Sequence, residues 1–363
     1  MRKILIFANI LLISFILCST VSFAANSSMA SSGSTGAYAK VGMSGGQFLK
    51  IGHGARGAAM AGAVSAITND LSSIYWNPAG LAEIPSLTAA FDYTSWFAGF
   101  NHNFAALGVP LGDNFAFAVH YTGLTSAEME RTTIERPNGT NQFFTASDIS
   151  VGLSVAGFLT DQFSFGLTTR FLNNVMADAS ASGLAFDVGT KYRTGVQGIV
   201  LGVSLHGLTT QLTYSGNEFN RVWRQSEALW KSPDDVALIP SPFDIPLLFR
   251  ANVAADVYKS PETVTSSLAT GDIPVHYVVA ALDFITTSDS PEQFALGAEY
   301  IWNNLLSFRA GYRMGHDIQG FSGGLGFKYF TGSFSGRLDY AISPLMRDMG
   351  LVNRISITID LGQ

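Results

Sequence analysis

A glycine-rich hexapeptide near the N-terminus has the spacing of a nucleotide-binding loop. Gly52-His53-Gly54-Ala55-Arg56-Gly57 matches the dinucleotide fingerprint G-x-G-x-x-G, and Asp70 lies near the expected acidic position. That motif binds a pyrophosphate only within a β-α-β unit, and nothing downstream supplies a second parallel strand. We therefore expect no nucleotide cofactor, and expect the glycines to let this backbone turn tightly and pack closely.

A serine and a histidine with possible hydrolase chemistry lie two residues apart. Ser204 and His206 share one face of an extended segment. A hydrolase that acts on membrane lipids needs its nucleophile on the lipid-facing side, and the apolar alternate residues Ile199 to Leu205 occupy that side instead. Other histidines are scattered, and the sequence has no H-E-x-x-H motif or His/Asp cluster. We therefore predict no catalytic residues, no metal site and no enzyme activity.

The elements that carry these residues alternate apolar with small or polar side chains, as in Phe163 to Phe171. A strand directs successive side chains to opposite faces, so each such segment has one apolar and one polar face. We predict fourteen strands, near 86–97, 102–111, 114–124, 147–159, 163–173, 181–193, 198–208, 246–258, 275–286, 292–302, 305–314, 321–330, 334–342 and 352–361.

Two all-β architectures fit this pattern: a sandwich with apolar faces inward, or a transmembrane barrel with apolar faces toward lipid. The charged fraction is 13% and the mean hydropathy is +0.24. Soluble domains carry about 25% charged residues, so too little charge is present to cover a soluble surface of this size. Together with the export signal described next, this favours an antiparallel transmembrane β-barrel in outer-membrane lipids. The net charge of −6 and the lack of a basic patch argue against nucleic acid.

Residues 1–24 have the layout of a cleaved signal peptide. Arg2 and Lys3 precede an apolar run from Ile4 to Val21, and Ser22-Phe23-Ala24 forms a small-x-small cleavage site. The single cysteine, Cys18, lies within this segment, so the exported chain would have no thiol. We expect a flexible N-terminus over 25–35 and export to the outer membrane of a Gram-negative type of cell.

The predicted connections alternate in length. Even-numbered connections such as Gly112 to Asn114 are mostly tight, and odd-numbered ones include the long segments 125–146 and 209–245. Outer-membrane barrels have short periplasmic turns and longer outer loops, which places both barrel ends in the periplasm. Two connections depart from the rule: 98–101 is short, and 259–274 is long.

Residues 36–84 have no strand pattern and contain helix-like stretches such as Ala58–Thr68. This segment has the size of a plug inside or under a barrel formed by 85–363. A charged plug residue in a polar lumen needs a partner, and inward-facing Asp187, Glu299 and Arg309 are candidates. The residues predicted to anchor the plug are Gly52, Gly54, Arg56, Gly57, Asp70, Asn77, Pro78 and Gly80.

The longest connection carries apolar residues at a spacing of three to four, from Phe219 through Trp223 to Trp230. This spacing predicts a short amphipathic helix ending before Pro233. Its apolar face would either cap its own barrel or bind a protein partner. Two tryptophans on one outer loop make Phe219, Trp223 and Trp230 the best candidates for a partner site.

Blocks of sequence with a recognisable pattern are Phe48-Leu49-Lys50-Ile51, Ala55 to Ala63, Asn69-Asp70, Tyr75 to Ala82, Phe308 to Arg313, Gly323 to Phe327 and Asp339 to Ala341. In these blocks the chain resembles the PorV/PorQ family of outer-membrane proteins. Ala61 stands where that family more often has glycine. The Asn77-Pro78-Ala79-Gly80 block is also similar to the plug of the FadL fatty-acid transporters, a fourteen-stranded group. Gln363 departs from the aromatic C-terminal residue of many outer-membrane barrels.

The resemblance implies two functions of different classes. One is an accessory component of type IX secretion, which holds the C-terminal domain of secreted cargo or contacts the translocon and catalyses nothing. The other is a FadL-like channel for hydrophobic small molecules, gated by the plug. The first needs an apolar outer surface such as Trp223 and Trp230 would give, and the second needs an apolar pocket near the plug.

Overall fold

The computed structural model describes residues 44–134, 136–223, 234–265, 272–331, 334–346 and 349–362. Within them, fourteen antiparallel strands close into one barrel because β8 and β9 pair and complete the ring. The strands of the barrel are β1 (Leu87–Ser95), β2 (Asn101–Leu111), β3 (Phe115–Thr125), β6 (Ala146–Thr160), β7 (Phe163–Met176), β8 (Ala179–Arg193), β9 (Val200–Thr209), β13 (Leu248–Lys259), β16 (His276–Thr287), β17 (Ser290–Trp302), β18 (Leu306–Met314), β19 (Phe321–Thr331), β20 (Phe334–Pro344) and β21 (Leu351–Leu361).

The fourteen strands predicted from residue alternation are confirmed, with ends that differ by a few residues. The faces also follow the prediction. On β8, Leu184 and Val188 are exposed on the outside, while Asp187 and Lys191 are buried inside. A large apolar side chain outside and a charged one inside is the arrangement of a membrane barrel, so the inward-apolar sandwich is excluded.

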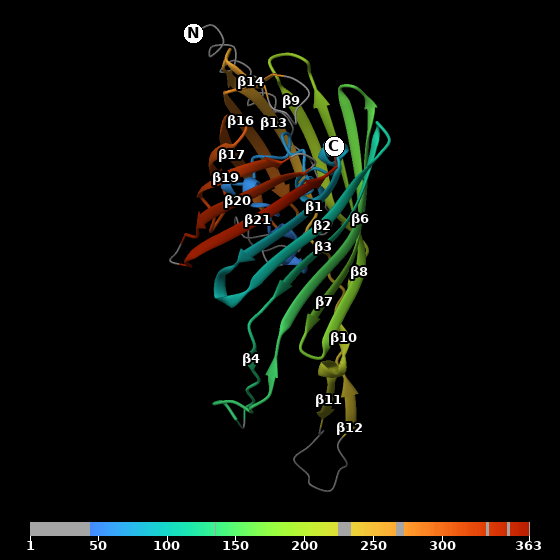
Figure 1. Ribbon diagram of the computed structural model, residues 1–363. Helices are drawn as coiled ribbons and strands as arrows, with labels where there is room; N and C mark the ends of the chain where they lie inside the picture. Colours follow the sequence, from blue (N-terminus) through green and yellow to red (C-terminus); the bar gives the residue numbers. More distant parts are fainter. Residues whose placement is uncertain are drawn as a thin grey trace. The chain divides into compact units, whose positions relative to one another are not determined.

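Short elements extend the two ends of the barrel. The hairpin of β4 (Met129–Glu130) with β5 (Phe143–Phe144), the short strand β10 (Ser215–Gly216) and the hairpin of β11 (Asn220–Trp223) with β12 (Asp234–Ala237) belong to the two longest odd-numbered connections. Figure 1 shows β4, β11 and β12 projecting from one end, which we call the long-loop end. The hairpin of β14 (Thr263–Thr265) with β15 (Asp272–Pro274) lies at the opposite end, the terminal end, where β1 begins and β21 finishes.

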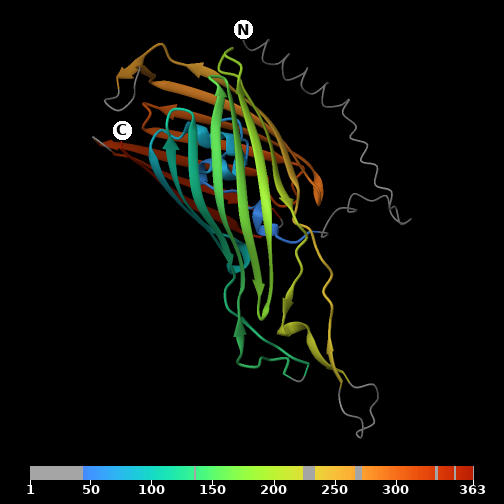
Figure 2. The ribbon, with the colours of Figure 1, turned by 90° about the vertical axis from the view of Figure 1, so that its right-hand side faces the viewer.

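Residues 44–84, the described part of the predicted plug, form short helical turns inside the ring of strands, drawn in blue in Figure 2. The turns are η1 (Gln47–Lys50), α2 (Ala55–Ala59), α3 (Ser73–Trp76) and η2 (Pro78–Glu83); two further turns, η3 (Phe97–Gly99) and η4 (Asn217–Phe219), belong to connections. Among the described residues, no helix is long and apolar enough to cross a membrane.

The helix expected over Ala58–Thr68 is wrong. The helix α2 ends at Ala59, and the following residues form turns. Ala61 and Gly62 have φ values of 54° and 91°, in the left-handed region that cannot continue a right-handed helix. Because a residue with a Cβ is strained there, the position of Ala61 suits glycine.

Candidate functional site

The plug crosses the lumen from one end of the barrel to the other. At the long-loop end, Gly45 N donates to Asp244 O at 2.9 Å, and Asp244 lies in the longest connection. At the terminal end, Glu83 forms ion pairs of 2.7 Å with both Lys191 and Arg193 of β8. Most side chains of 51–84 between these points are buried. The plug therefore fills the lumen along its length.

Six alternating charges, which we call the ion network, join the plug to β17, β18 and β20. Arg56 pairs with Glu299 at 2.7 Å, and Glu299 pairs with Arg309 at 2.6 Å. Arg309 pairs with Asp339 at 2.6 Å, Asp339 with Arg337 at 2.8 Å, and Arg337 with Asp70. Both ends of the series are plug residues and its middle is barrel wall. Three cations and three anions compensate one another, and only Arg56 and Arg337 among them are partly exposed.

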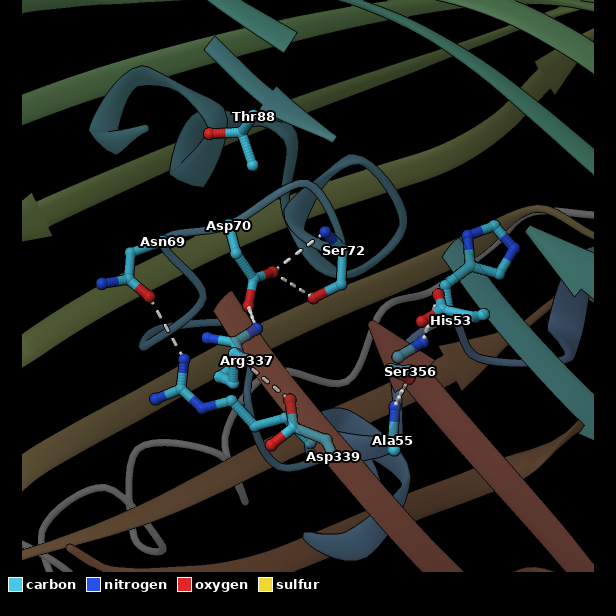
Figure 3. Close-up of polar contacts among 12 residues, drawn as sticks. His53, Ala55, Asn69, Asp70, Ser72, Thr88, Arg337, Asp339 and Ser356 are labelled. Atoms are coloured by element: carbon cyan, nitrogen blue, oxygen red, sulfur yellow. Dashed lines mark hydrogen bonds and ion pairs between the residues drawn. The ribbon is translucent and has the colours of Figure 1, made fainter. Parts of the chain in front are cut away.

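The Asp70 end of the ion network is also fixed within the plug. Figure 3 shows its carboxylate between Arg337 and Ser72. The other carboxylate oxygen accepts hydrogen bonds from Ser72 N at 2.9 Å and Ser72 Oγ at 2.5 Å. Burial opposes the charged form, but Arg337 and Arg56 hold the pKa of Asp70 well below its usual value. The carboxylate is therefore ionised at neutral pH, as the ion pairs require.

The short helix α2 is held by side chains of the barrel wall. Gly54 N donates to Asp92 Oδ2 at 3.0 Å, and Ala55 N donates to Ser356 Oγ at 2.6 Å. The first N–H groups of a helix have no partner within it, and Gly54 reaches this position with a φ of 79°. Wall residues from β1 and β21 thus supply the cap that the plug sequence lacks.

The indole ring of Trp76 packs against the backbone of the glycine-rich hexapeptide. Its Nε1 donates to His53 O at 2.8 Å. A Cβ added to Gly52 or Gly57 would lie 2.6 or 2.5 Å from the indole ring. The two outer glycines of the hexapeptide therefore allow the ring to lie directly against the backbone, which is the packing role expected of them.

The Asn77-Pro78-Ala79-Gly80 block joins the plug to β7 and β8. Asn77 Oδ1 accepts from Ala79 N at 3.1 Å, and Asn77 Nδ2 donates to Thr190 O at 3.0 Å. A Cβ at Gly80 would lie 2.5 Å from Thr68 O. Pro78 begins η2 directly against Gly166 of the wall. Plug and wall backbones meet here without intervening side chains.

We expect Gly166→Ala to displace the plug. The added Cβ would lie 2.2 Å from the carbonyl carbon of Pro78, and overpacking of this kind costs about 1–3 kcal/mol. The variant barrel should be cleaved by protease within residues 50–84 roughly tenfold faster than wild type, since cleavage follows the population of the open form. The matched control is Gly323→Ala, whose Cβ has its nearest neighbour at 3.7 Å. Equal cleavage of the two variants would contradict this packing role.

The Ser204 and His206 pair acquires a carboxylate neighbour in the fold. His206 Nε2 lies 3.0 Å from Ser204 Oγ, and His206 Nδ1 lies 3.8 Å from Asp187 Oδ1. Ser204 Oγ is fully buried and donates to Trp76 O at 3.2 Å. Because the hydroxyl proton is used by a plug carbonyl, the three residues act as one more contact between plug and wall.

Buried histidines gather where the sequence shows only scattered ones. His53 of the plug stacks on Phe104 with ring centroids 4.4 Å apart and lies 5.3 Å from His102, while His120 is 6.4 Å from Phe104. Burial, with His102 nearby, lowers the pKa of His53. Within the described part of the chain, no group of three or more His, Cys, Asp or Glu residues could hold a metal ion. The cluster forms because His53 of the plug lies against the neighbouring strands β2 and β3, so no local motif could reveal it.

The partner-site prediction falls on a region that the structure describes only in part. Asn220–Trp223 forms β11, paired with β12 in antiparallel register, so the helix predicted there is wrong. The ladder satisfies the backbone of Val222 and Trp223, residue types that favour strands. Trp230 lies outside the described residues. The three apolar residues therefore do not form one helical face.

Phe219 does line a groove at the long-loop end, with a volume of about 700 Å³. Its walls come from the β4/β5 connection, from the turn after β7 and from the longest connection. The large apolar lining residues are Phe144, Met176, Tyr214, Phe219 and Leu238, and Glu130 to Thr133 form a polar side of the groove. Met176 and Leu238 are more than half exposed. The groove thus offers an exposed, largely apolar wall beside a polar one.

The closed barrel and its internal plug define a structural class, and solved structures with this fold are found. They include the toluene transporter TodX of Pseudomonas putida (TM-score 0.54, 13% identity, covering 85% of this chain and 97% of that one). The toluene transporter TbuX of Ralstonia pickettii (0.51, 14%, 86% and 99%) and the CymD monoaromatic hydrocarbon channel (0.50, 13%, 86% and 98%) are also similar.

At these identities the likeness concerns the fold. No protein-family model matches the chain, and the comparison with curated proteins finds no match. The similarity in fold agrees with the barrel that the FadL resemblance implies, while the comparisons give no support to PorV/PorQ in particular.

Proposed function

We propose that this protein is a non-enzymatic channel of the FadL type, which carries small hydrophobic molecules across the outer membrane. The observation that carries the proposal is the folded plug that spans the lumen of a closed barrel. The plug is attached to the wall by ion pairs and hydrogen bonds, which can break and form again. A barrel closed by a separable plug has the parts of a gated passage.

The outer membrane is the proposed location. The barrel has an apolar exterior in which Tyr258, Trp302, Tyr312 and Tyr329 are exposed, mostly near strand ends. Aromatic residues at this level are typical of membrane interfaces. A signal peptide over 1–24 and a flexible segment over 25–35 belong to this proposal, and both lie outside the described residues.

Hydrophobic molecules are the proposed substrates for two reasons. The groove at the long-loop end offers an apolar surface at the outer mouth, and pockets of about 300–1,000 Å³ suit small-molecule ligands. In addition, the neighbours TodX and TbuX are toluene transporters. The groove would collect the molecule before it reaches the plug.

Type IX secretion is the alternative function, with the translocon or cargo C-terminal domains as partners. It rests on the sequence resemblance to PorV/PorQ. The three neighbours described above are transporters or channels, and the loop that would hold cargo is described in part. No contact in the described residues favours it over the channel.

The direct test is uptake of radiolabelled toluene by cells that lack other hydrocarbon channels. Cells that produce the protein should take up toluene several-fold faster than cells with an empty vector. Equal rates, with the barrel present and heat-modifiable on gels, would contradict a hydrocarbon channel. The secretion function would be favoured by a different result. In that case, deletion of the gene for this protein would leave toluene uptake unchanged and would remove a co-expressed type IX cargo from the medium.

A second experiment tests the groove. We expect Phe219→Ala with Tyr214→Ala to slow uptake at low toluene concentration about thirtyfold and leave the maximal rate unchanged, because aromatic contacts in a binding site commonly contribute about 2 kcal/mol. Phe327→Ala, an exposed aromatic residue on the barrel wall, is the control. An unchanged concentration dependence would remove the groove from the path.

A further inference from the structure

A second cavity, of about 420 Å³, lies at the long-loop end between η1, the beginning of β13 and the loop 315–320. It differs from the groove because charged and polar side chains dominate its lining. The cationic or basic residues among them are Lys50, Arg250, Arg313 and His316, and the acidic ones are Asp289 and Asp317. Chemistry that the hydrophobic channel does not use is therefore concentrated here.

Arg250 is the central residue of this cavity. Its side chain is 1% exposed, and its Nε and Nη1 have no hydrogen-bond partner among the described residues. Its guanidinium lies over the rings of Trp76 and Tyr75, at 4.9 and 5.5 Å from their centroids. A cation–π contact of this kind uses none of the N–H donors. A buried guanidinium with free donors at a cavity is arranged for an acceptor.

The nearest buried carboxylate does not fill that role. Asp283 Oδ2 accepts hydrogen bonds from Ser65 Oγ and Ser65 N of the plug. No ion pair joins Asp283 to Arg250 in the described structure, and Asp283 Oδ1 is itself without a hydrogen bond. Asp283 therefore acts on Arg250 through its charge without a hydrogen bond between them, while its hydrogen bonds come from the plug serine.

Neighbouring groups add donors to the same cavity. Arg313 Nη1 donates to Gln319 Oε1 at 3.0 Å, while its Nε has no partner in the described residues. His316 Nδ1 accepts from Ile318 N and Gln319 N at 3.2 and 3.1 Å, which leaves Nε2–H as a donor. Burial, with Arg313 and Lys50 nearby, lowers the pKa of His316 to about 4, so the ring is neutral at pH 7.

The acids of the cavity only partly offset this charge. Asp289 is held by Lys50 at 2.9 Å and by Gln47 at 2.7 Å, so these groups compensate one another. Asp317 is exposed. Of the acids that line the cavity, Asp317 is thus the one that Lys50 does not hold, while Asp283 acts on both arginines through its charge from outside the lining.

We propose that this cavity binds a compact organic anion, whose carboxylate is held by Arg250 and Arg313. Guanidinium groups match a planar carboxylate with paired N–H donors. The rest of the ligand would lie against Leu248, Ile285 and Ile318, which also line the cavity. The inference goes beyond the proposed hydrocarbon channel and does not depend on it, because binding can be measured without transport.

The experiment is calorimetric titration of the purified, detergent-solubilised barrel with sodium benzoate. We expect saturable binding that Arg250→Gln and Arg313→Gln each weaken at least tenfold, since a hydrogen bond to a charged group contributes strongly to affinity. Arg136→Gln, which removes the same charge from an exposed outer-loop residue that does not line the cavity, should leave binding unchanged. Heat-modifiable gel mobility checks that each variant folds.

Competing ligands decide the chemistry. Toluene, which has the ring without the carboxylate, should fail to displace benzoate; equal displacement would overturn the anion site. Sulfate should compete weakly, and competition as strong as that of benzoate would contradict an organic ligand. Tighter binding of laurate would contradict a compact one. Unchanged benzoate affinity in both arginine variants would remove these residues from the site. Toluene uptake measured in parallel reports separately on the channel.

Discussion

Replacement of Glu299 by alanine is expected to release the plug more than any other single change in the ion network. Glu299 is 1% exposed and accepts ion pairs from Arg56 and Arg309. Removing it leaves two buried guanidinium groups without their shared partner, and losing one member of a buried pair commonly costs about 3–5 kcal/mol. The open population of the plug should therefore rise by at least about a hundredfold.

Two measurements check this result. Protease should cut within residues 50–84 about a hundredfold faster than in wild type, and single-channel recordings should show larger or longer openings. Arg56→Ala should have a smaller effect in the same direction, because Glu299 keeps Arg309 as a partner. Lys259→Ala, which breaks an exposed pair with Asp256, is the control, since such pairs contribute about 0–1 kcal/mol. Wild-type behaviour of Glu299→Ala would mean that the plug is held by backbone packing alone.

Much of the barrel could be predicted from the sequence because strand alternation and turn chemistry are local. Side chains such as Leu184 and Asp187 alternate along one strand, and that strand alone specifies which face is apolar. The structure of the plug and of the long connections was harder to predict from the sequence. Turns at Ala61 and Gly62 break a stretch whose composition suits a helix, and β11 replaces a helix because it pairs with β12, a strand that a local pattern does not predict.

The contacts of the candidate site depend on pairings that no local pattern contains. The sequence offers Asp187, Glu299 and Arg309 as possible partners of the plug. In the fold Arg56 pairs with Glu299, whereas Asp187 pairs with Arg170 of the wall at 2.5 Å. Asp70 finds Arg337, which is 267 positions away in the chain. Which acidic residue pairs with which basic residue is decided by the register of the strands and by the closure of the barrel, which bring distant parts of the chain together.

Wall glycines were also not recognisable as functional. A Cβ at Gly189 would lie 2.2 Å from Asn77 Oδ1, and one at Gly311 would lie 2.2 Å from the Met60 carbonyl carbon. In sequence these glycines look like ordinary small residues on the polar face of a strand. The fold shows why glycine is needed at these positions. Each glycine leaves free the space that a side chain would occupy, and the plug lies in that space.

The close approach of plug and wall makes a covalent test of gating possible. A Cβ on Gly297 would lie 2.9 Å from the Cβ of Met60. Disulfides need about 3.5–4.5 Å between Cβ atoms, so a shift of about 1 Å would allow Met60→Cys and Gly297→Cys to cross-link. The single native cysteine, Cys18, lies in the predicted signal peptide, so the exported barrel would contain no competing thiol.

We expect the oxidised double variant to lose toluene uptake to the level of cells without the protein, and a reductant to restore it. The physical reason is that a plug tied to β17 cannot leave a lumen that it fills from one end to the other. The same molecules before and after reduction are their own control for the lost Met60 packing, and each single-cysteine variant controls for the oxidant. If uptake continues while gels show complete cross-linking, hydrophobic molecules pass without movement of this part of the plug, and the ion network serves stability instead of gating.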